Sequence, residues 1–361
     1  MTRRIGCATL AGGLLVAGLA APAAHAAGPL TQFTPGDLVI YRVGDGTQSL
    51  ANTGNAVFLD EYTTSGTYVG SVALPTTSGG GNNALVASGT ATSEGGLTLS
   101  PDGTKLALTG YDPPTFPYGS SLASSASATV PRTVGLVDGN ANVNTSTALT
   151  DFASGNNPRS AVTTDGTSLW VAGAAATPRY ATAGATVSTQ ISTTVTNLRQ
   201  INIFNGQLYV SDSSGSAVRV GTVGSGLPTT SPQTITNLPG FPTSGSPYQF
   251  VLVQLQAGGG TAPDTLYVAE DTTSGGQLQK YSLVSGSWVA TGTVAASAVR
   301  GLTASVSGTT VNLYGTTGGS TAAGGGSLYT FTDTTGYDGT ISGSATTIAT
   351  AAANEAFRGI A

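Results

Sequence analysis

Short runs of apolar residues alternate with glycine and small polar residues along almost the whole chain. The runs are rich in Val, Leu, Ile, Tyr and Thr, and Gly, Asp, Asn or Ser separates them. Such runs predict β-strands, because β-branched and aromatic side chains suit a pleated surface and the separating residues suit turns. Few segments show a helical period over ten residues. The pattern therefore predicts an all-β protein.

One unit, made of two strands around a tight turn, recurs along the chain. Its copies begin at Gly96, Ser160, Gln200, Val251 and Gly301. Four of the turns have hairpin-turn sequences, namely Asp102-Gly103, Asp165-Gly166, Asn205-Gly206 and Ser307-Gly308. Two further strand-like runs follow the pair, as in residues 276–286 and 288–294. Four antiparallel strands in a unit of about 50 residues are typical of a β-propeller blade.

The two ends of the chain complete the count of blades. Residues 37–46, 56–66 and 67–75 resemble the second, third and fourth strands of a blade, and residues 357–361 resemble a first strand. We therefore expect the ends to share one blade and to close a ring of six, at about 56 residues a blade. Seven blades remain an alternative. A parallel β-helix is a weaker one, because its shorter coils do not explain the hairpin turns.

The first 26 residues have the pattern of a secretory signal peptide. Arg3 and Arg4 precede an apolar run over residues 8–20, and Ala24-His25-Ala26 matches the small-residue cleavage rule. We expect cleavage near Ala26, which leaves residues 27–361 as a single propeller domain outside the cell or in the periplasm. No later stretch approaches 18 apolar residues, so we expect no membrane span.

Cleavage would remove Met1, Cys7 and His25, which are the single Met, Cys and His of the chain. The mature chain could then form no disulfide, thiolate metal site, His-ligated zinc site or Ser-His-Asp triad. Chemistry would depend on Asp, Glu, Arg, Lys, Tyr, Ser or Thr. We expect no cofactor, although a calcium ion held by oxygen ligands stays possible in principle.

Charge argues against several partners. The chain has 12 basic and 17 acidic residues, and loss of Arg3 and Arg4 leaves ten basic ones, a net charge of −7. Because no basic run exists, we expect neither nucleic acid nor an anionic membrane as a partner. We expect a monomer.

Two motifs carry a resemblance to known families. The sequence SPDGTKL at residues 100–106 and the LYV strands at Leu208 and Leu266 resemble secreted bacterial propellers of the NHL, YVTN and TolB kind. These motifs specify a turn between two strands. The resemblance therefore implies a propeller fold and no particular activity.

Arginine recurs at one position of the predicted first strands. Arg159, Arg199, Arg300 and Arg358 occupy it in four of the six blades, and Gly95 (after Glu94) and Gln249 occupy it in the others. First strands line the central channel of a propeller. The four arginines, with Gln249 and Glu94, are therefore our candidates for a channel-mouth site that binds a carboxylate, sulfate or phosphate.

A structural role for these arginines is the competing interpretation. Each could pair with an acid of a neighbouring blade and so hold the ring together. Acids at the ends of second strands could serve, namely Asp45, Asp112, Asp212, Glu270 and Asp271.

Three further features have weaker implications. The adjacent carboxylates Asp60-Glu61 and Glu270-Asp271 point to opposite faces of a strand, so we interpret them as solvated or paired with arginine rather than catalytic.

An insertion at residues 112–131 carries Phe116 and Tyr118, which could form a stacking platform for a sugar or peptide, or belong to an uninvolved loop. Aromatic residues recur in second strands and predict packing between blades: Tyr41, Tyr209, Tyr267, Tyr314 and Trp170.

Two functions remain open on the sequence. The first is a secreted, non-catalytic propeller that binds an extracellular protein, a glycan or an anionic small molecule through one face or the channel mouth. The alternative is an extracellular hydrolase or lyase, sialidase-like or lactonase-like, that uses the arginine ring for an anionic substrate. The arginines favour the sialidase-like version, but the Asp-box motif of sialidases is not reproduced. A quinone-dependent dehydrogenase would need repeated Trp motifs, and the chain has two Trp.

Overall fold

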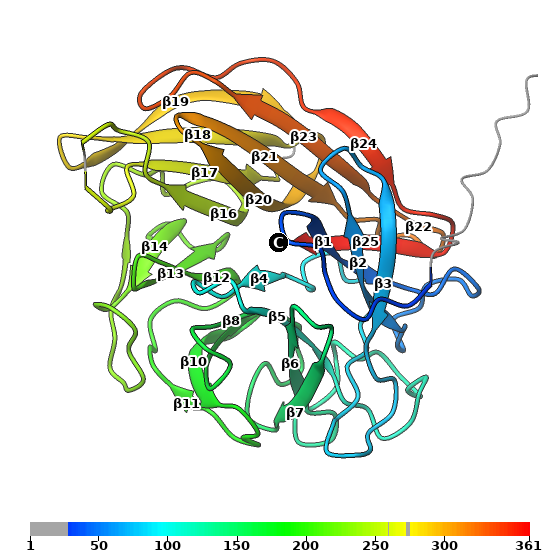
Figure 1. Cartoon of the computed structure of the whole chain (residues 1–361). Helices are drawn as coiled ribbons and strands as arrows, with labels where there is room; N and C mark the ends of the chain where they lie inside the picture. The colour runs from blue at the N-terminus through cyan, green and yellow to red at the C-terminus, as the bar shows by residue number, and fades with distance from the viewer. Residues whose placement is uncertain (1–27, 259, 272–274) are drawn as a thin grey trace, which may run out of the picture.

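Short strands and tight turns build six small antiparallel sheets around a central axis (Figure 1). The computed structural model describes residues 28–258, 260–271 and 275–361, and the regular elements in these ranges are all strands. The six sheets are the blades of a β-propeller, so the predicted fold is confirmed and the seven-bladed alternative is wrong. The predicted signal peptide lies outside the described residues. Within them, no helix is long and apolar enough to cross a membrane.

Five blades follow one another along the chain, and in each the strands pair in sequence order from the axis outward. Blade 1 contains β4 (Thr98–Leu99), β5 (Lys105–Tyr111), β6 (Arg132–Asp138) and β7 (Val143–Leu149). Blade 2 contains β8 (Pro158–Thr163), β9 (Ser168–Gly173), β10 (Ala176–Thr182) and β11 (Thr189–Gln190). Blade 3 contains β12 (Leu198–Phe204), β13 (Gln207–Asp212), β14 (Val220–Val223) and β15 (Ile235–Asn237). Blade 4 contains β16 (Pro247–Val253), β17 (Thr265–Glu270), β18 (Gln277–Val284) and β19 (Ser287–Ala295). Blade 5 contains β20 (Val299–Ser307), β21 (Thr310–Thr317), β23 (Ser327–Asp333) and β24 (Thr346–Thr350).

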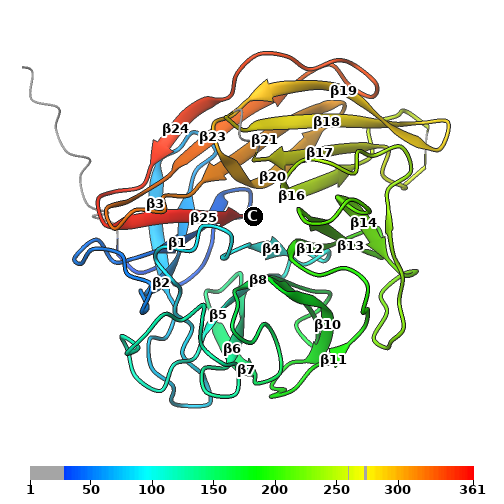
Figure 2. The ribbon, with the colours of Figure 1, turned by 180° about the vertical axis from the view of Figure 1, so that it is seen from behind.

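The two ends of the chain form the sixth, closing blade. It contains β1 (Leu38–Val43), β2 (Val57–Tyr62) and β3 (Tyr68–Ala73), with β25 (Glu355–Ile360) on the axial side and the short β22 (Gly324–Gly325) beside β25. Strands β1 and β25 are antiparallel, with Ile40 opposite Ile360 and Val43 opposite Ala356. The view from behind shows the C-terminus at the centre of the ring (Figure 2). The predicted closure by both ends is therefore confirmed.

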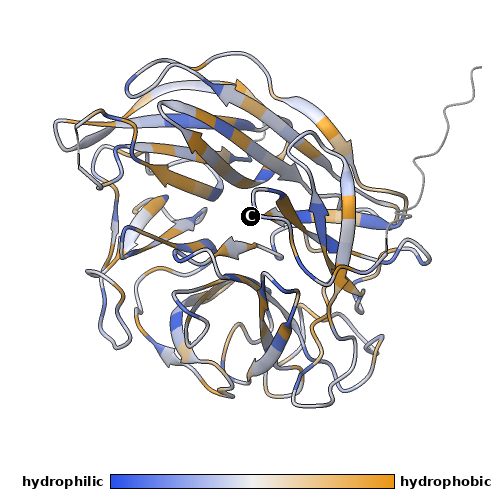
Figure 3. Ribbon diagram, viewed as in Figure 1, coloured by the Kyte–Doolittle hydropathy of each residue, from blue (hydrophilic) through white to orange (hydrophobic). Residues whose placement is uncertain are grey.

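A separate hydrophobic cluster fills each of the six interfaces between neighbouring blades. Successive side chains of a strand serve opposite interfaces, as Leu106 and Leu108 face the closing blade while Ala107 faces blade 2. Apolar residues accordingly recur along the strands of every blade (Figure 3). The predicted role of the recurring aromatic residues in packing is confirmed, since all of them belong to or pack against these clusters: Tyr41, Tyr209, Tyr267, Tyr314 and Trp170.

Glycine allows the axial strands to approach closely where the ring closes. The Gly359 amide donates a hydrogen bond of 2.9 Å to the Gly95 carbonyl. A Cβ atom at Gly359 would lie 2.4 Å from the Leu97 nitrogen, which no real contact allows. One at Gly96 would lie 2.5 Å from Oε1 of Gln200. The axial strands therefore lie too close together at these two positions to accommodate a Cβ atom.

Candidate functional site

Gln249 of β16 lies at the base of the channel mouth. Its Nε2 donates to the carbonyls of Leu97 (2.7 Å) and Ile360 (3.2 Å). Its Oε1 accepts from the amides of Leu302 and Ile360, both at 3.2 Å. This amide therefore bridges blade 4 to blade 1, blade 5 and the closing blade. Its hydrogen-bonding capacity is used by the fold, although the residue also lines the mouth as the repeat alignment predicted.

Above Gln249 lies a small polar cavity. Its volume is about 20 Å³, measured as the space open to the centre of a water molecule, which is enough for one or two waters. Residues from five parts of the ring contribute to its polar walls: Thr92, Ser93, Arg199, Tyr248, Arg300 and Arg358. Three of the four predicted arginines line it. The fourth, Arg159, does not, but it lies close enough to Arg199 for their charges to interact.

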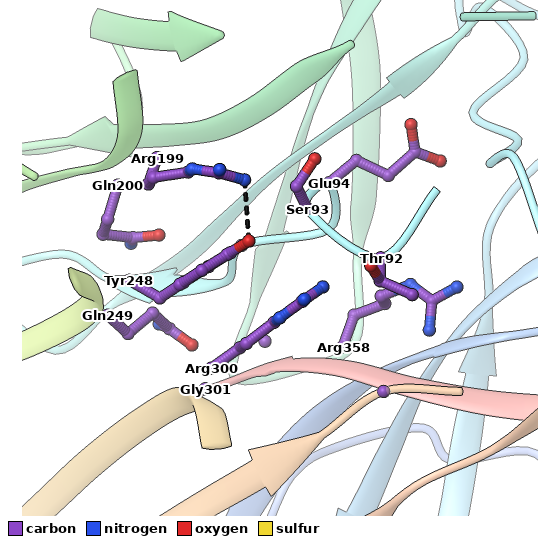
Figure 4. Close-up of a pocket in the computed structure, with 13 residues that line it drawn as sticks. Thr92, Ser93, Glu94, Arg199, Gln200, Tyr248, Gln249, Arg300, Gly301 and Arg358 are labelled. Atoms are coloured by element: carbon purple, nitrogen blue, oxygen red, sulfur yellow. Dashed lines mark hydrogen bonds between the residues drawn. The ribbon is translucent and has the colours of Figure 1, made fainter. Parts of the chain in front are cut away.

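Two of these arginines stack on one tyrosine. The guanidinium carbons of Arg199 and Arg300 lie 4.6 and 4.8 Å from the ring centre of Tyr248. Arg199 also donates to the Tyr248 hydroxyl at 2.7 Å and to the hydroxyl of Ser213 at 2.7 Å. The three side chains run side by side toward the segment of Thr92 and Ser93 (Figure 4). Cation–π contacts on a buried ring fix both guanidinium groups in place.

One of the four arginines forms the predicted ion pair with a second-strand acid. Arg300 holds Asp271 through Nε at 2.8 Å and Nη2 at 2.6 Å. The structural interpretation therefore applies to this arginine. Nη1 of Arg300 takes no part in this pair and has no hydrogen-bond partner in the described structure. Arg300 also lines the cavity.

The other acids suggested as partners bind elsewhere. Asp45 accepts from Thr47, Asp112 from Ser78 and the Ala84 amide, and Asp212 from Ser214. Glu270 accepts from the Ser246 amide. The prediction that these acids pair with all four arginines is therefore wrong. The carboxylate oxygens of Asp45, Asp112, Asp212 and Glu270 already accept hydrogen bonds from nearby turns.

Arg159 and Arg358 are buried without a carboxylate partner among the described residues. Arg159 donates to Asn197 Oδ1 at 2.7 Å and to the Leu198 carbonyl at 3.1 Å. Arg358 donates to carbonyl groups, including that of Gly89 at 3.1 Å. The pKa of each guanidinium is lowered to about 10, chiefly by burial. The charge of Arg199 contributes to the lowering at Arg159, whereas the charge of Glu94 opposes it at Arg358. Both side chains remain charged at neutral pH.

Three guanidinium N–H groups of the ring have no hydrogen-bond partner in the described structure. They are Nε of Arg159, Nη1 of Arg300 and Nε of Arg358. A buried donor without a partner costs roughly 1–3 kcal/mol, and more when it is charged. Such groups are expected where a ligand supplies the missing acceptor.

Glu94 is the one carboxylate among the residues that line this cavity. Its Oε1 accepts from the Ser88 amide at 2.6 Å, and its Oε2 accepts from Tyr111 and Asn157, both at 2.9 Å. Burial raises its pKa to about 7, although these hydrogen bonds and Arg358 oppose the shift. Its carboxylate points away from Tyr248 and the two stacked arginines (Figure 4). Glu94 therefore shapes the wall of the mouth rather than its centre.

The 112–131 insertion lies between β5 and β6, as predicted, and packs firmly on blade 1. Its Leu122 and Val130 are fully buried. Arg132, also fully buried, donates to the carbonyls of Ser125 (2.7 Å), Ala153 (3.0 Å) and Asn156 (3.1 Å). The segment is thus anchored.

The two aromatic candidates of this insertion have different environments. Tyr118 packs against the cluster that contains Leu122 and Val130. Phe116 is 37% exposed and borders two surface cavities, of about 350 and 300 Å³. Neither residue lines the channel mouth. A stacking role for Phe116 therefore stays a prediction about a separate surface.

The adjacent carboxylates serve the structure. Asp60 pairs with Arg42 at 2.5 Å, while Glu61 accepts from the Thr34 amide at 2.6 Å. Asp271 pairs with Arg300. Their interpretation as arginine partners is confirmed for Asp60 and Asp271. In the described ranges, no three His, Cys, Asp or Glu residues cluster as metal ligands would.

Sequence reasoning missed Tyr248, Thr92 and Ser93. Tyr248 directly precedes Gln249, the residue aligned with the arginines, so its place near the mouth could have been inferred from the repeat. Thr92 and Ser93 lie in an irregular segment before β4 that has no counterpart in other blades. No pattern in the sequence indicated them.

No protein-family model matches this sequence, and no curated protein is significantly similar to it. Solved structures with a similar arrangement include a suspected 6-phosphogluconolactonase from Bacteroides fragilis, with 14% identity over 88% of this chain and 83% of that chain (TM-score 0.47). Another, from Bacteroides uniformis, has 13% identity over 86% and 82% (TM-score 0.45). Hydrazine synthase from Kuenenia stuttgartiensis has 16% identity over 66% and 63% (TM-score 0.38). At this level the matches carry no argument about activity, and the resemblance to the NHL, YVTN and TolB groups stays a prediction.

Proposed function

We propose that this protein is a non-catalytic binding propeller that holds an anionic group of its ligand in the channel mouth. Arg199, Arg300 and Arg358 bind the group, and Arg159 adds positive charge behind them. The ligand is an extracellular glycan, protein or small molecule. The protein acts as a monomer outside the cell or in the periplasm, after removal of residues 1–26.

The observation that carries this proposal is the pair of buried guanidinium N–H groups without acceptors on Arg300 and Arg358, two of the arginines that line the cavity. A purely structural arginine would find acceptors in the fold, as Arg132 does. Arg300 and Arg358 both line the cavity, and an anion bound beside them would supply acceptors that the fold does not.

The charge balance supports the same proposal. Four guanidinium groups surround or back the mouth, and one of them is neutralised by Asp271. Glu94, with a pKa of about 7, offsets one more charge only in part at neutral pH. The mouth therefore stays positive although the mature chain as a whole is acidic. A local positive field of this kind attracts and holds anions.

Thermal unfolding of residues 27–361 with added anions tests the proposal. Sulfate, phosphate, glucuronate and N-acetylneuraminate are each exchanged for chloride at constant ionic strength. An anion at 100 times its Kd adds about 2.7 kcal/mol to the free energy of unfolding. We expect at least one of them to raise Tm by several degrees.

Two variants separate the site from general charge effects. Arg300→Gln removes one cavity-facing guanidinium and should weaken anion binding at least tenfold. Arg179→Gln is the matched control, because Arg179 of β10 pairs at 2.8 Å with Asp151, which follows β7, and does not line the mouth. If no anion raises Tm, or if Arg300→Gln responds like Arg179→Gln, the proposed function is wrong.

An enzyme that acts on an anionic substrate is the second candidate, and Tyr248 is the observation that favours it. A phenol hydroxyl beside two guanidinium groups could act on a substrate held by them. Against this, the Glu94 carboxylate is occupied by three protein donors. Hydrolysis of a panel of chromogenic glycosides of acidic sugars, lost in Tyr248→Phe with anion binding retained, would establish the enzyme and overturn the non-catalytic proposal.

A further inference from the structure

The directions from which donors reach the mouth point to the shape of the bound group. Arg199 comes from β12, Arg300 from β20 and Arg358 from β25, so three different blades contribute. Thr92 and Ser93 lie opposite the tips of Arg199 and Arg300 (Figure 4). A planar carboxylate is satisfied by one guanidinium fork in its own plane. Donors on several sides match a group whose oxygens also point to several sides.

The charge around the cavity points to the number of negative charges. Of the three guanidinium groups that line the cavity, Arg300 is paired with Asp271, which leaves those of Arg199 and Arg358. Arg159, whose charge interacts with that of Arg199, adds a third positive charge. The carboxylate of Glu94 offsets this charge only in part at neutral pH, because its pKa is about 7. A single negative charge would leave a buried guanidinium without a counter-ion, and this is costly in a site of low polarity. Two negative charges balance the site.

We propose that the group bound in the mouth is a doubly charged tetrahedral oxyanion, a sulfate or phosphate, held by Arg199, Arg300 and Arg358 with the hydroxyls of Thr92 and Ser93. This inference rests on the proposed anion-binding function and narrows its ligand. The cavity of about 20 Å³ holds only one or two waters, so the oxyanion lies at the opening of the cavity with one oxygen directed inward. A free ion and a phosphate monoester present the same chemistry, and any remainder of an ester lies outside the cavity.

Calorimetric titration of residues 27–361 at pH 7.5 and constant ionic strength tests the shape and the charge separately. Sulfate is compared with methanesulfonate, which has tetrahedral sulfur but one charge, and with glucuronate, which carries a planar carboxylate. We expect sulfate to bind at least tenfold more tightly than either. If methanesulfonate or glucuronate binds as tightly as sulfate, this inference is overturned while anion binding stands. If none of the three binds, both proposals are overturned.

A second comparison assigns the source of the oxyanion. Inorganic phosphate and glycerol 3-phosphate are titrated under the same conditions. Equal affinities support a phosphate ester as the ligand, because the remainder of the molecule is then tolerated outside the cavity. A tenfold preference for inorganic phosphate supports the free ion. Failure of both to bind, with sulfate bound, would overturn the extension to phosphate.

Two mild substitutions keep the test independent of folding. Arg300→Lys keeps the positive charge but loses the planar guanidinium group with its parallel N–H donors, and we expect at least a fivefold loss of sulfate affinity. Ser93→Ala removes a partly exposed hydroxyl and should cost severalfold in affinity without changing Tm. Arg179→Lys is the control and should bind sulfate as the unsubstituted protein does. Sulfate affinity that is unchanged in both Arg300→Lys and Ser93→Ala would overturn the assignment of the site.

Discussion

The side-chain amide of Gln249 forms two hydrogen bonds with the main chain of Ile360, donating to its carbonyl and accepting from its amide, each at 3.2 Å. The two residues are 111 positions apart and belong to blade 4 and the closing blade. A side chain thus completes main-chain hydrogen bonding at the point where the axial strands meet. This contact forms the base of the mouth and ties the last strand of the chain to the ring.

Gln249→Leu should destabilise the protein by about 2–4 kcal/mol. Leucine has a similar size, but the carbonyl of Leu97 and both main-chain groups of Ile360 would lose a buried partner, at about 1–3 kcal/mol for each unsatisfied group before relaxation. Urea unfolding monitored by circular dichroism measures the change. Gln256→Ala, at an exposed position, is the control and should change stability by less than about 0.5 kcal/mol. Equal stabilities of the two variants would contradict the proposed role of Gln249.

Gly359→Ala should weaken the closing blade. The added Cβ would lie 2.4 Å from the Leu97 nitrogen and 2.6 Å from the Gly95 carbonyl oxygen. Both are main-chain atoms, which cannot relieve the clash by a change of rotamer as a flexible side chain can. We expect a loss of several kcal/mol or a failure to fold, with faster amide exchange in β25. Gly139→Ala provides the comparison, because nothing lies within 4 Å of its Cβ position. A normal Tm for Gly359→Ala would show that the axial strands have room to move apart.

Lys280→Met should be among the most destabilising single changes. The fully buried ammonium of Lys280 pairs with Asp333 at 2.8 Å and donates to the carbonyl of Gly336 at 2.6 Å, joining blade 4 to blade 5. Loss of Lys280 leaves the buried carboxylate of Asp333 without a counter-charge, although Tyr267 and Thr335 still donate to it, and breaking a buried ion pair in this way typically costs about 3–5 kcal/mol. The paired change Lys280→Met with Asp333→Leu should cost less than Lys280→Met alone, as measured by urea unfolding.

Lys105 is the matched control for that substitution. Its ammonium lies 3.6 Å from Asp138 on a partly exposed surface. Lys105→Met should therefore change stability by less than about 1 kcal/mol. If Lys280→Met and Lys105→Met unfold at the same urea concentration, the ion pair of Lys280 does not hold the two blades together.

Glu94 should make stability depend on pH. Burial raises its pKa in the folded protein from 4.5 to about 7, so between these values the folded state binds more protons than the unfolded state. The contribution of Glu94 to the free energy of unfolding is therefore fully present below about pH 4.5. It decreases as the pH rises from about 4.5 to about 7, and it does not change further above pH 7. The total is on the order of 3 kcal/mol.

Glu94→Gln tests this dependence, because an amide of the same shape does not titrate. The free energy of unfolding, measured from pH 4.5 to pH 8, should fall less steeply in the variant than in the unsubstituted protein. Tyr111 and Arg358, the ionisable groups whose charges or hydrogen bonds act on Glu94, are present in both proteins. Parallel pH profiles would mean that Glu94 titrates normally in the folded state.

The sequence determined the fold because the information for it is local and repeated. Alternating apolar positions and Asp-Gly or Asn-Gly turns specify hairpins within about 20 residues, and repetition every 50 residues or so specifies the ring. The same repeat aligned Arg159, Arg199, Arg300 and Arg358, since equivalent positions of equivalent strands lie at equivalent places around the axis.

Only the tertiary structure decided what each aligned residue contacts. Asp271 pairs with Arg300, whereas in the part of the chain that the structure describes no carboxylate forms an ion pair with Arg159 or Arg358, and this depends on how turns from neighbouring blades meet. Tyr248 stacks between residues that lie about 50 positions away on either side of it in the chain. The orientation of Glu94 likewise depends on Tyr111 and Asn157. Side-chain contacts at the axis join several blades at once, as those of Gln249 do, and a pattern within one blade carries no information about them.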